Sequence, residues 1–345
     1  MPFNKTKTSD IIKSEKKTNY SLNFLKFFAI FTVIIIHCDL WKIGTEGMVI
    51  DGVARFPIII FFLISGFYSF YPDDSKALNT YKRRSNKLIK LLLIASVLYF
   101  VYMAFAKFPD LLLKLNLNAL LDLIIFNVTP FGFHLWFILA LIFCYLLYYI
   151  LIKLQIKPNT LYKYIPILIL FSLVLGEFFM LIFVEVYAKG NISESIELSF
   201  LTFKYYRNFL FTGLPFFTLG YLIHDKKDFL IKNLSNSLLI ALGIFGILLT
   251  FLEVLVVGKV DVYIGSIIFA VCAFIWCVKN PNTLNFKITE FIGGKLYGLI
   301  YILHLMILWI INPQFGYLNP IICFIPTTII CAIIYFILRK IGLEK

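Results

Sequence analysis

Charged residues are scarce in this chain, and long polar stretches are few. Asp, Glu, Lys and Arg make up 15% of the sequence, whereas hydrophobic residues make up 61%. Soluble domains carry about 25% charged residues, so this balance excludes an ordinary soluble enzyme. The composition instead indicates a membrane protein with several spans.

Motifs for nucleotide or metal chemistry are also missing. The chain has no Walker loop, GxGxxG, GxSxG or DxD motif and no CxxC pair, and its four histidines are scattered. ATP hydrolysis and metal-dependent glycosyl transfer are therefore unsupported, and we expect no metal cofactor. The six cysteines lie in or beside apolar segments, where we expect them to be small buried residues.

Apolar runs of bilayer length fill most of the chain. They cover about 21–42, 53–71, 88–107, 134–154, 163–187, 207–224, 234–257, 262–278, 291–311 and 318–338. Segment 110–132 carries polar residues every few positions, which favours an interfacial or re-entrant helix. The sequence therefore predicts an all-α polytopic membrane protein of about ten transmembrane helices over 21–340, after a polar tail at 1–20.

The basic residues fall mostly on one side of such a bundle. If residues 1–20 are cytoplasmic, most of the 32 Lys and Arg lie in that tail, in the cytoplasmic loops and at the C-terminal end. The positive-inside rule then predicts both ends in the cytosol. Most of the positive charge behind the net charge of +13 is therefore expected to face membrane lipid rather than nucleic acid. The sequence also permits a homodimer.

The first span contains two ionisable residues, Lys26 and His37. Eleven positions make about three helical turns, so both side chains point to nearly the same side, roughly 16 Å apart along the axis. Ionisable residues inside a membrane helix indicate a functional site. The alternative is an interfacial histidine with a lysine whose ammonium reaches the interface.

Other polar residues occur at or near the same depth. His134 and Trp136 open the fourth span, Arg207 and Asn208 open the sixth, and Glu177 lies inside the fifth. Trp136 alone is ordinary at a membrane interface. Glu177 must meet a partner from another helix or carry a proton.

Three further groups complete the candidates. Tyr301 and His304 share one face of the ninth span with Tyr297. Ser65, followed by glycine in the second span, is either a substrate contact or part of a small-residue helix contact. The basic residues between the second and third spans either bind a phosphate-rich ligand or serve topology and anionic lipid; they are Lys82, Arg83, Arg84, Lys87 and Lys90.

Six segments, in order, resemble the membrane-bound acyltransferase 3 family, whose members O-acylate cell-surface polysaccharides, peptidoglycan and lipid-linked sugars. Its Arg-x10-His is similar to Lys26-x10-His37, and its R-x-x-R/K to Arg84-x-x-Lys87. The other four matches are FFLISGF at 61–67, HLWF at 134–137, RNFLFTGLPFFTLG at 207–220 and YGLIYILH at 297–304. Lysine at position 26 keeps the charge of the family's arginine but loses its planar fork.

The resemblance implies acyl transfer through the cell (plasma or inner) membrane. Cytosolic acetyl-CoA is the expected donor, with its phosphates near Arg83, Arg84 and Lys87 and its acyl arm passing Lys26. His37 is the expected general base or transient acyl carrier, with Glu177 orienting a partner. The acceptor is a hydroxyl of a cell-surface or lipid-linked glycan, with candidate contacts from His134, Trp136, Arg207, Asn208, Tyr301, His304 and Ser65.

Two other functions are alternatives to acyl transfer. One is a transporter or exporter of a polar or lipid-linked solute, because the branch of the family with a similar sixth span includes proteins of that kind. The other is a structural membrane protein, which explains neither Glu177 nor the pairing of Lys26 with His37. An enzyme requires a CoA ester and fails without His37, whereas a transporter does not use CoA.

Overall fold

The computed structural model describes residues 18–106, 116–179, 182, 204–311 and 319–342. Most of the tail predicted at 1–20, the first part of segment 110–132 and most of the loop predicted at 188–206 lie outside these ranges. Helices make up 83% of the described chain, and no strand occurs in it. The predicted all-α class is therefore confirmed.

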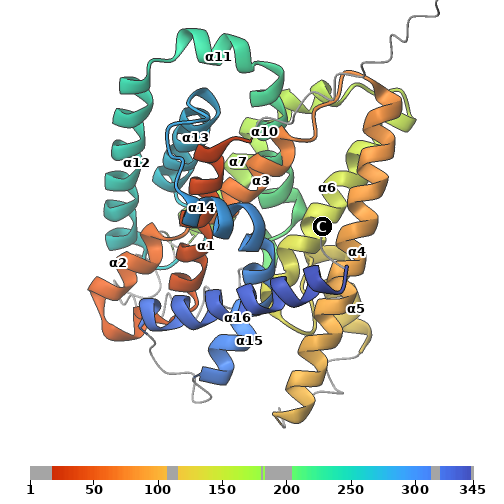
Figure 1. Ribbon diagram of the computed structural model, residues 1–345. Helices are drawn as coiled ribbons and strands as arrows, with labels where there is room; N and C mark the ends of the chain where they lie inside the picture. Colours follow the sequence, from red (N-terminus) through yellow and green to blue (C-terminus); the bar gives the residue numbers. More distant parts are fainter. Residues whose placement is uncertain (1–17, 107–115, 180–181, 183–203, 312–318, 343–345) are drawn as a thin grey trace, which may run out of the picture.

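The helices form one bundle (Figure 1). The longer ones, in chain order, are α1 (Tyr20–Ile36), α2 (Thr45–Val53), α3 (Pro57–Phe67), α4 (Asp74–Phe105), α5 (Leu117–Phe126), α6 (Trp136–Lys153), α7 (Ile165–Leu173), α10 (Leu214–Asp225), α12 (Asn236–Val257), α13 (Ile264–Lys279), α15 (Tyr297–Ile311) and α16 (Pro320–Lys340). The short elements are η1 (Leu40–Ile43), η3 (Phe133–Leu135), η4 (Pro158–Tyr164), η5 (Val174–Phe178), η6 (Phe209–Gly213), α11 (Lys227–Asn233), α14 (Lys287–Phe291) and η7 (Ile292–Leu296).

Seven helices in the described ranges are long and apolar enough to cross a membrane. They cover Thr45–Phe67, Asp74–Phe105, Phe133–Lys153, Pro158–Phe178, Asn236–Val257, Lys287–Ile311 and Pro320–Lys340. Three shorter apolar helices are Tyr20–Ile36, Leu117–Phe126 and Ile264–Lys279. Large apolar side chains on the outer faces of α4, α12 and α16 are exposed, as expected for surfaces that meet lipid.

The basic segment at 72–87 is not the loop that the sequence predicts. Asp73 caps the helix by accepting hydrogen bonds from the backbone N–H groups of Ser75 and Lys76, so α4 begins at Asp74. Its 32 residues make a rod of about 48 Å, which exceeds the hydrocarbon thickness of about 30 Å. The first half of α4 is therefore a helical extension that carries the basic side chains beyond the apolar half.

Helices α3 and α10 lie at the centre and approach closely through glycines (Figure 1). A Cβ atom at Gly66 would lie 1.8 Å from the carbonyl oxygen of Phe217, and one at Gly220 would lie 2.1 Å from that of Leu63. No other residue fits either position without moving a backbone. Gly66 is thus part of a helix contact, whereas a substrate contact by Ser65 stays a prediction.

Candidate active site

Three histidines from distant parts of the chain meet in the bundle. His37 follows the last residue of α1, His134 lies in η3, and His304 lies in α15. The His304 ring centroid is 5.1 Å from that of His37 and 5.0 Å from that of His134. His134 and His304 are buried, whereas His37 is half-buried.

The spacing of Lys26 and His37 explains how α1 reaches this cluster. Both residues contact the same helix, because Lys26 Nζ lies 5.0 Å from the ring centroid of Tyr297 at the start of α15, and His37 meets His304 two turns later. Lys26 also donates to Asn23 Oδ1 at 3.0 Å. The prediction that Lys26 and His37 point to the same side is confirmed, and Lys26 lies well away from the histidines.

A cavity of about 70 Å³ borders His37 and His134. Its walls combine apolar and aromatic side chains with three charged ones. The lining consists of Val33, Ile36, His37, Arg55, Pro57, Ile58, Phe61, Phe133, His134, Trp136, Phe137, Arg207, Thr212, Asp261 and Tyr301. Aromatic faces beside fixed charges suit a polar organic group with apolar edges.

The charged wall is an ion-pair network around Asp261. Arg207 holds this carboxylate with two bonds, Nε to Oδ2 at 2.5 Å and Nη2 to Oδ1 at 2.6 Å. Arg55 Nη1 donates to the same Oδ1 at 2.7 Å, and its Nε and Nη2 donate to Asp51. Two arginines on separate elements are therefore fixed by one carboxylate from the loop between α12 and α13.

Asp261 stays ionised despite its surroundings. Burial acts to raise the pKa of Asp261, but the charges of Arg207 and Arg55 outweigh it and hold this pKa below its usual value. Two residues earlier, burial lowers the pKa of Lys259 to about 8, although Asp51 opposes that effect. The loop thus carries one strongly stabilised charge and one destabilised charge.

The remaining candidates around the cavity hold its wall in place. The Trp136 ring lies 6.0 Å from the Arg207 guanidinium, and the Tyr301 hydroxyl donates to the backbone carbonyl of His134. Asn208 is engaged in capping, since its side chain accepts from the backbone N–H groups of Leu210 and Phe211. Trp136 and Tyr301 therefore line the cavity, whereas Asn208 shapes the backbone behind Arg207.

Glu177 lies in a different place, inside the π-helical turn η5. Its Oε2 accepts from the backbone N–H of Ile264 at 3.3 Å, and its side chain is hydrogen-bonded to that of Glu253 in α12. Glu253 in turn accepts from the backbone N–H of Gly265 at 3.0 Å. Glu177 therefore meets a partner from another helix, as its burial requires, and it is not among the residues that line the cavity.

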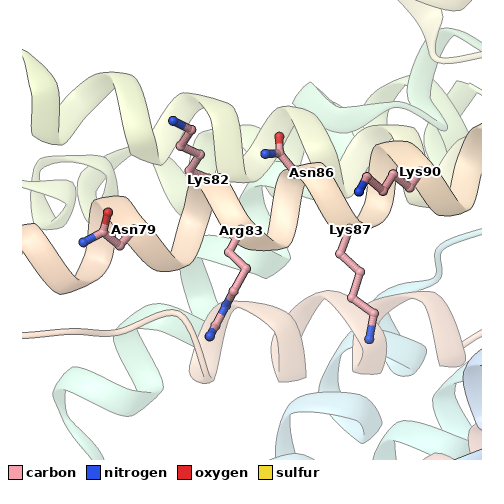
Figure 2. A pocket seen from close by; sticks show the side chains of 6 residues that line it. All are labelled: Asn79, Lys82, Arg83, Asn86, Lys87 and Lys90. Carbon is pink, nitrogen blue, oxygen red and sulfur yellow. The ribbon is translucent and has the colours of Figure 1, made fainter. Parts of the chain in front are cut away.

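The basic residues of α4 divide into two sets. Arg83 and Lys87 are exposed and extend from one side of the helix, whereas Lys82 and Asn86 extend from the other (Figure 2). Together with Asn79 and Lys90 they border an open groove of about 500 Å³. Arg84 instead points into the bundle, where it donates to the hydroxyls of Ser69 and Tyr145 at 3.0 and 3.3 Å.

Helix α3 connects the two regions. Pro57, its first residue, lines the cavity, and Ser69, two residues past its end, binds Arg84. Twelve residues of helical rise place these ends about 18 Å apart. The basic end of α4 and the histidine cavity therefore lie at opposite ends of the central helix.

Several residues of this site escape sequence reasoning. Arg55 and Asp261 are charged residues at the ends of apolar runs, and Glu253 lies within one. Arg55 and Asp261 have opposite charges and lie at span ends on the same side of the predicted bundle. This was the one signal in the sequence that could have paired them. The described ranges contain no group of three His, Cys, Asp or Glu side chains arranged to hold a metal ion.

Comparison with known proteins gives one match. Residues 19–339 match the family model of the acyltransferase domain of acyltransferase 3 proteins, which is nearly the whole chain. No curated protein matches. No solved structure matches either.

Proposed function

Because the chain belongs to the acyltransferase 3 family, we propose that it moves an acyl group from cytosolic acetyl-CoA to a hydroxyl of a cell-surface or lipid-linked glycan. In this proposal the seven long apolar helices cross the membrane, and so do α1, α13 and the η6–α10 segment, which makes ten spans. Both chain ends then face the cytosol of the cell membrane, in keeping with the distribution of Lys and Arg.

The position of His37 carries the proposal. It borders a small cavity lined by aromatic and charged side chains at one end of α3, while Arg83, Arg84 and Lys87 lie near the other end. A CoA ester has its phosphates far from its thioester, so a basic end and a distant reactive end suit it. Phosphate groups favour the exposed guanidinium of Arg83 and the ammonium of Lys87.

In the transfer step, His37 takes the proton of the acceptor hydroxyl. The hydroxyl oxygen forms the new ester bond at the acyl carbonyl, the thioester bond breaks, and the CoA thiolate leaves. A covalent acyl-His37 intermediate is the other route to the same products. The cavity is small, about 70 Å³, which supports acetyl rather than succinyl as the transferred group.

The first test is turnover of acetyl-CoA by purified protein in lipid. Wild type is expected to release CoA slowly without acceptor and rapidly with it, and His37→Ala is expected to lose this release. The control is His224→Asn, because His224 binds the carbonyl of Phe67 outside the cavity and asparagine retains a donor there. Folded protein that neither binds nor consumes a CoA ester contradicts the proposal and favours transport.

The donor site has a separate test. Arg83→Ala and Lys87→Ala are each expected to raise the KM for acetyl-CoA about tenfold without changing kcat, because each removes one charged contact to phosphate. The same KM comparison is repeated with 3′-dephospho-acetyl-CoA. The variant that lacks the contact to the 3′-phosphate is then expected to have the same KM as wild type. Unchanged KM values in both variants contradict this placement of the donor.

A further inference from the structure

His304 is locked in one tautomer by its own helix. Its Nδ1 lies 3.1 Å from the carbonyl oxygen of Ile300 and 2.8 Å from that of Tyr301. A carbonyl oxygen only accepts, so Nδ1 carries the proton and Nε2 of the neutral ring carries the lone pair. Nε2 is fully buried and has no hydrogen-bond partner within the described part of the chain.

His134 is locked in the opposite tautomer. Its Nε2 lies 3.3 Å from the carbonyl oxygen of Ile302, so Nε2 carries the proton and Nδ1 the lone pair. This Nδ1 is also buried, without a partner among the described residues. Two buried acceptor nitrogens thus lie within one cluster. Each destabilises the folded protein as long as it lacks a hydrogen-bond donor.

Among the described residues, only one ring beside His304 has a donor to offer. The N–H of His134 is directed to Ile302, and the hydroxyl of Tyr301 donates to the backbone of His134. His37 is the third ring neighbour. The structure has no hydrogen bond between these two rings, but their centres are 5.1 Å apart, and two ring radii plus a hydrogen bond of about 2.9 Å fit this distance once the His37 ring turns.

We propose that His304 is a positioning residue for His37. When the His37 ring turns toward His304, Nε2 of His304 accepts a hydrogen bond from one ring nitrogen of His37, which fixes the tautomer of His37 and leaves the other nitrogen, with its lone pair, facing the cavity. Of these two histidines, His134 lines that cavity and His304 does not. The role of His37 in turnover rests on the proposed function, whereas the tautomers do not.

The direct test is nitrogen NMR of protein in lipid with ¹⁵N-labelled histidine rings, assigned by single substitutions. We expect His304 protonated at Nδ1, His134 protonated at Nε2, and His37 in a single tautomer. In His304→Ala the His37 signals are expected to become those of a tautomer mixture. Protonation of His304 at Nε2, or His37 signals that ignore the substitution, overturns the proposal.

Turnover gives the second readout. His304→Ala is expected to lower kcat about 10- to 100-fold with little change in the KM for donor. His304→Gln places an amide oxygen near the position of Nε2 and is expected to recover part of kcat, whereas His304→Asn, which replaces only Nδ1, is not. Equal rates in the glutamine and asparagine variants overturn the proposal. Full turnover by His37→Ala contradicts the proposed function and leaves the tautomer result standing.

Discussion

Arg207 and Asp261 form a two-bond ion pair across 54 residues of sequence, and Arg55 shares the same carboxylate. The pair joins the start of η6 to the loop before α13 and forms one wall of the histidine cavity. Removing either partner leaves a charge that is largely withdrawn from water. The wall is therefore both a structural junction and a fixed electrostatic surface beside His37.

Asp261→Asn is expected to destabilise the protein by about 3–5 kcal/mol, because Arg207 and Arg55 both lose their shared counter-charge. Thermal unfolding in detergent measures the effect. Asp228→Asn on the exposed surface of α11 is the matched control and is expected to change little. An Asp261→Asn protein as stable as this control contradicts the buried network.

The outline of the fold is readable from the sequence because apolar runs of bilayer length mark helices directly. The shared face of Lys26 and His37 is equally readable, since it depends only on the helical period within one element. The start of α4 is not, because hydropathy marks only the apolar half of a helix and Lys and Arg are themselves good helix formers. The length of α4 emerges only once Asp73 is seen as its cap.

The site is less readable, since its partners lie far apart in the chain. Arg55 and Asp261 are separated by 206 positions, and no local period connects them. Glu177 is visible as an isolated buried carboxyl, but its partner Glu253 belongs to another helix. A single sequence identifies residues that need partners, and only the fold identifies which partners they have.

The contact between α3 and α10 predicts a strong effect of one added methyl group. Gly66→Ala is expected to destabilise the protein by at least about 1–3 kcal/mol, because the new Cβ would lie 1.8 Å from a backbone oxygen of α10. Gly298→Ala in α15 is the control. Apart from the neighbouring residues of its own helix, no atom lies within 4 Å of a Cβ placed there. If both variants unfold at the same temperature, this close approach is wrong.

Replacing Glu177 by glutamine is expected to be harmless. Two carboxyl groups joined by a hydrogen bond share a proton, so Glu177→Gln replaces a protonated carboxyl by an amide of the same shape. Stability is expected to stay within about 1 kcal/mol of wild type and turnover is expected to persist, whereas Glu177→Leu costs about 1–3 kcal/mol by removing the hydrogen-bond partner of the Glu253 carboxyl. Loss of turnover in folded Glu177→Gln would instead support the catalytic role that the sequence suggests.

The size of the histidine cavity predicts which acyl groups the enzyme accepts. Phe137 lines the cavity and contacts Tyr301 with ring centroids 5.5 Å apart, so Phe137→Ala enlarges the space beside His37. The variant is expected to raise the ratio of butyryl-CoA to acetyl-CoA turnover about tenfold, in the range that a few methylenes give in a pocket. Phe143→Ala, in the same helix but against Phe209, is expected to leave the ratio unchanged. An unchanged ratio in Phe137→Ala contradicts acyl binding in this cavity.

Lys259 makes stability depend on pH. Burial lowers its pKa to about 8, whereas an unfolded lysine titrates near 10.4. Between these values the unfolded chain binds more protons, so this group makes the free energy of unfolding rise with pH, by on the order of 3 kcal/mol over the whole window.

Lys259→Met removes the charge, so the variant is expected to be more stable than wild type at pH 7, with the difference shrinking by pH 9.5. Unfolding temperatures at both pH values measure this, with exposed Lys232→Met as control. A difference that does not shrink with pH contradicts a buried, destabilised charge at Lys259.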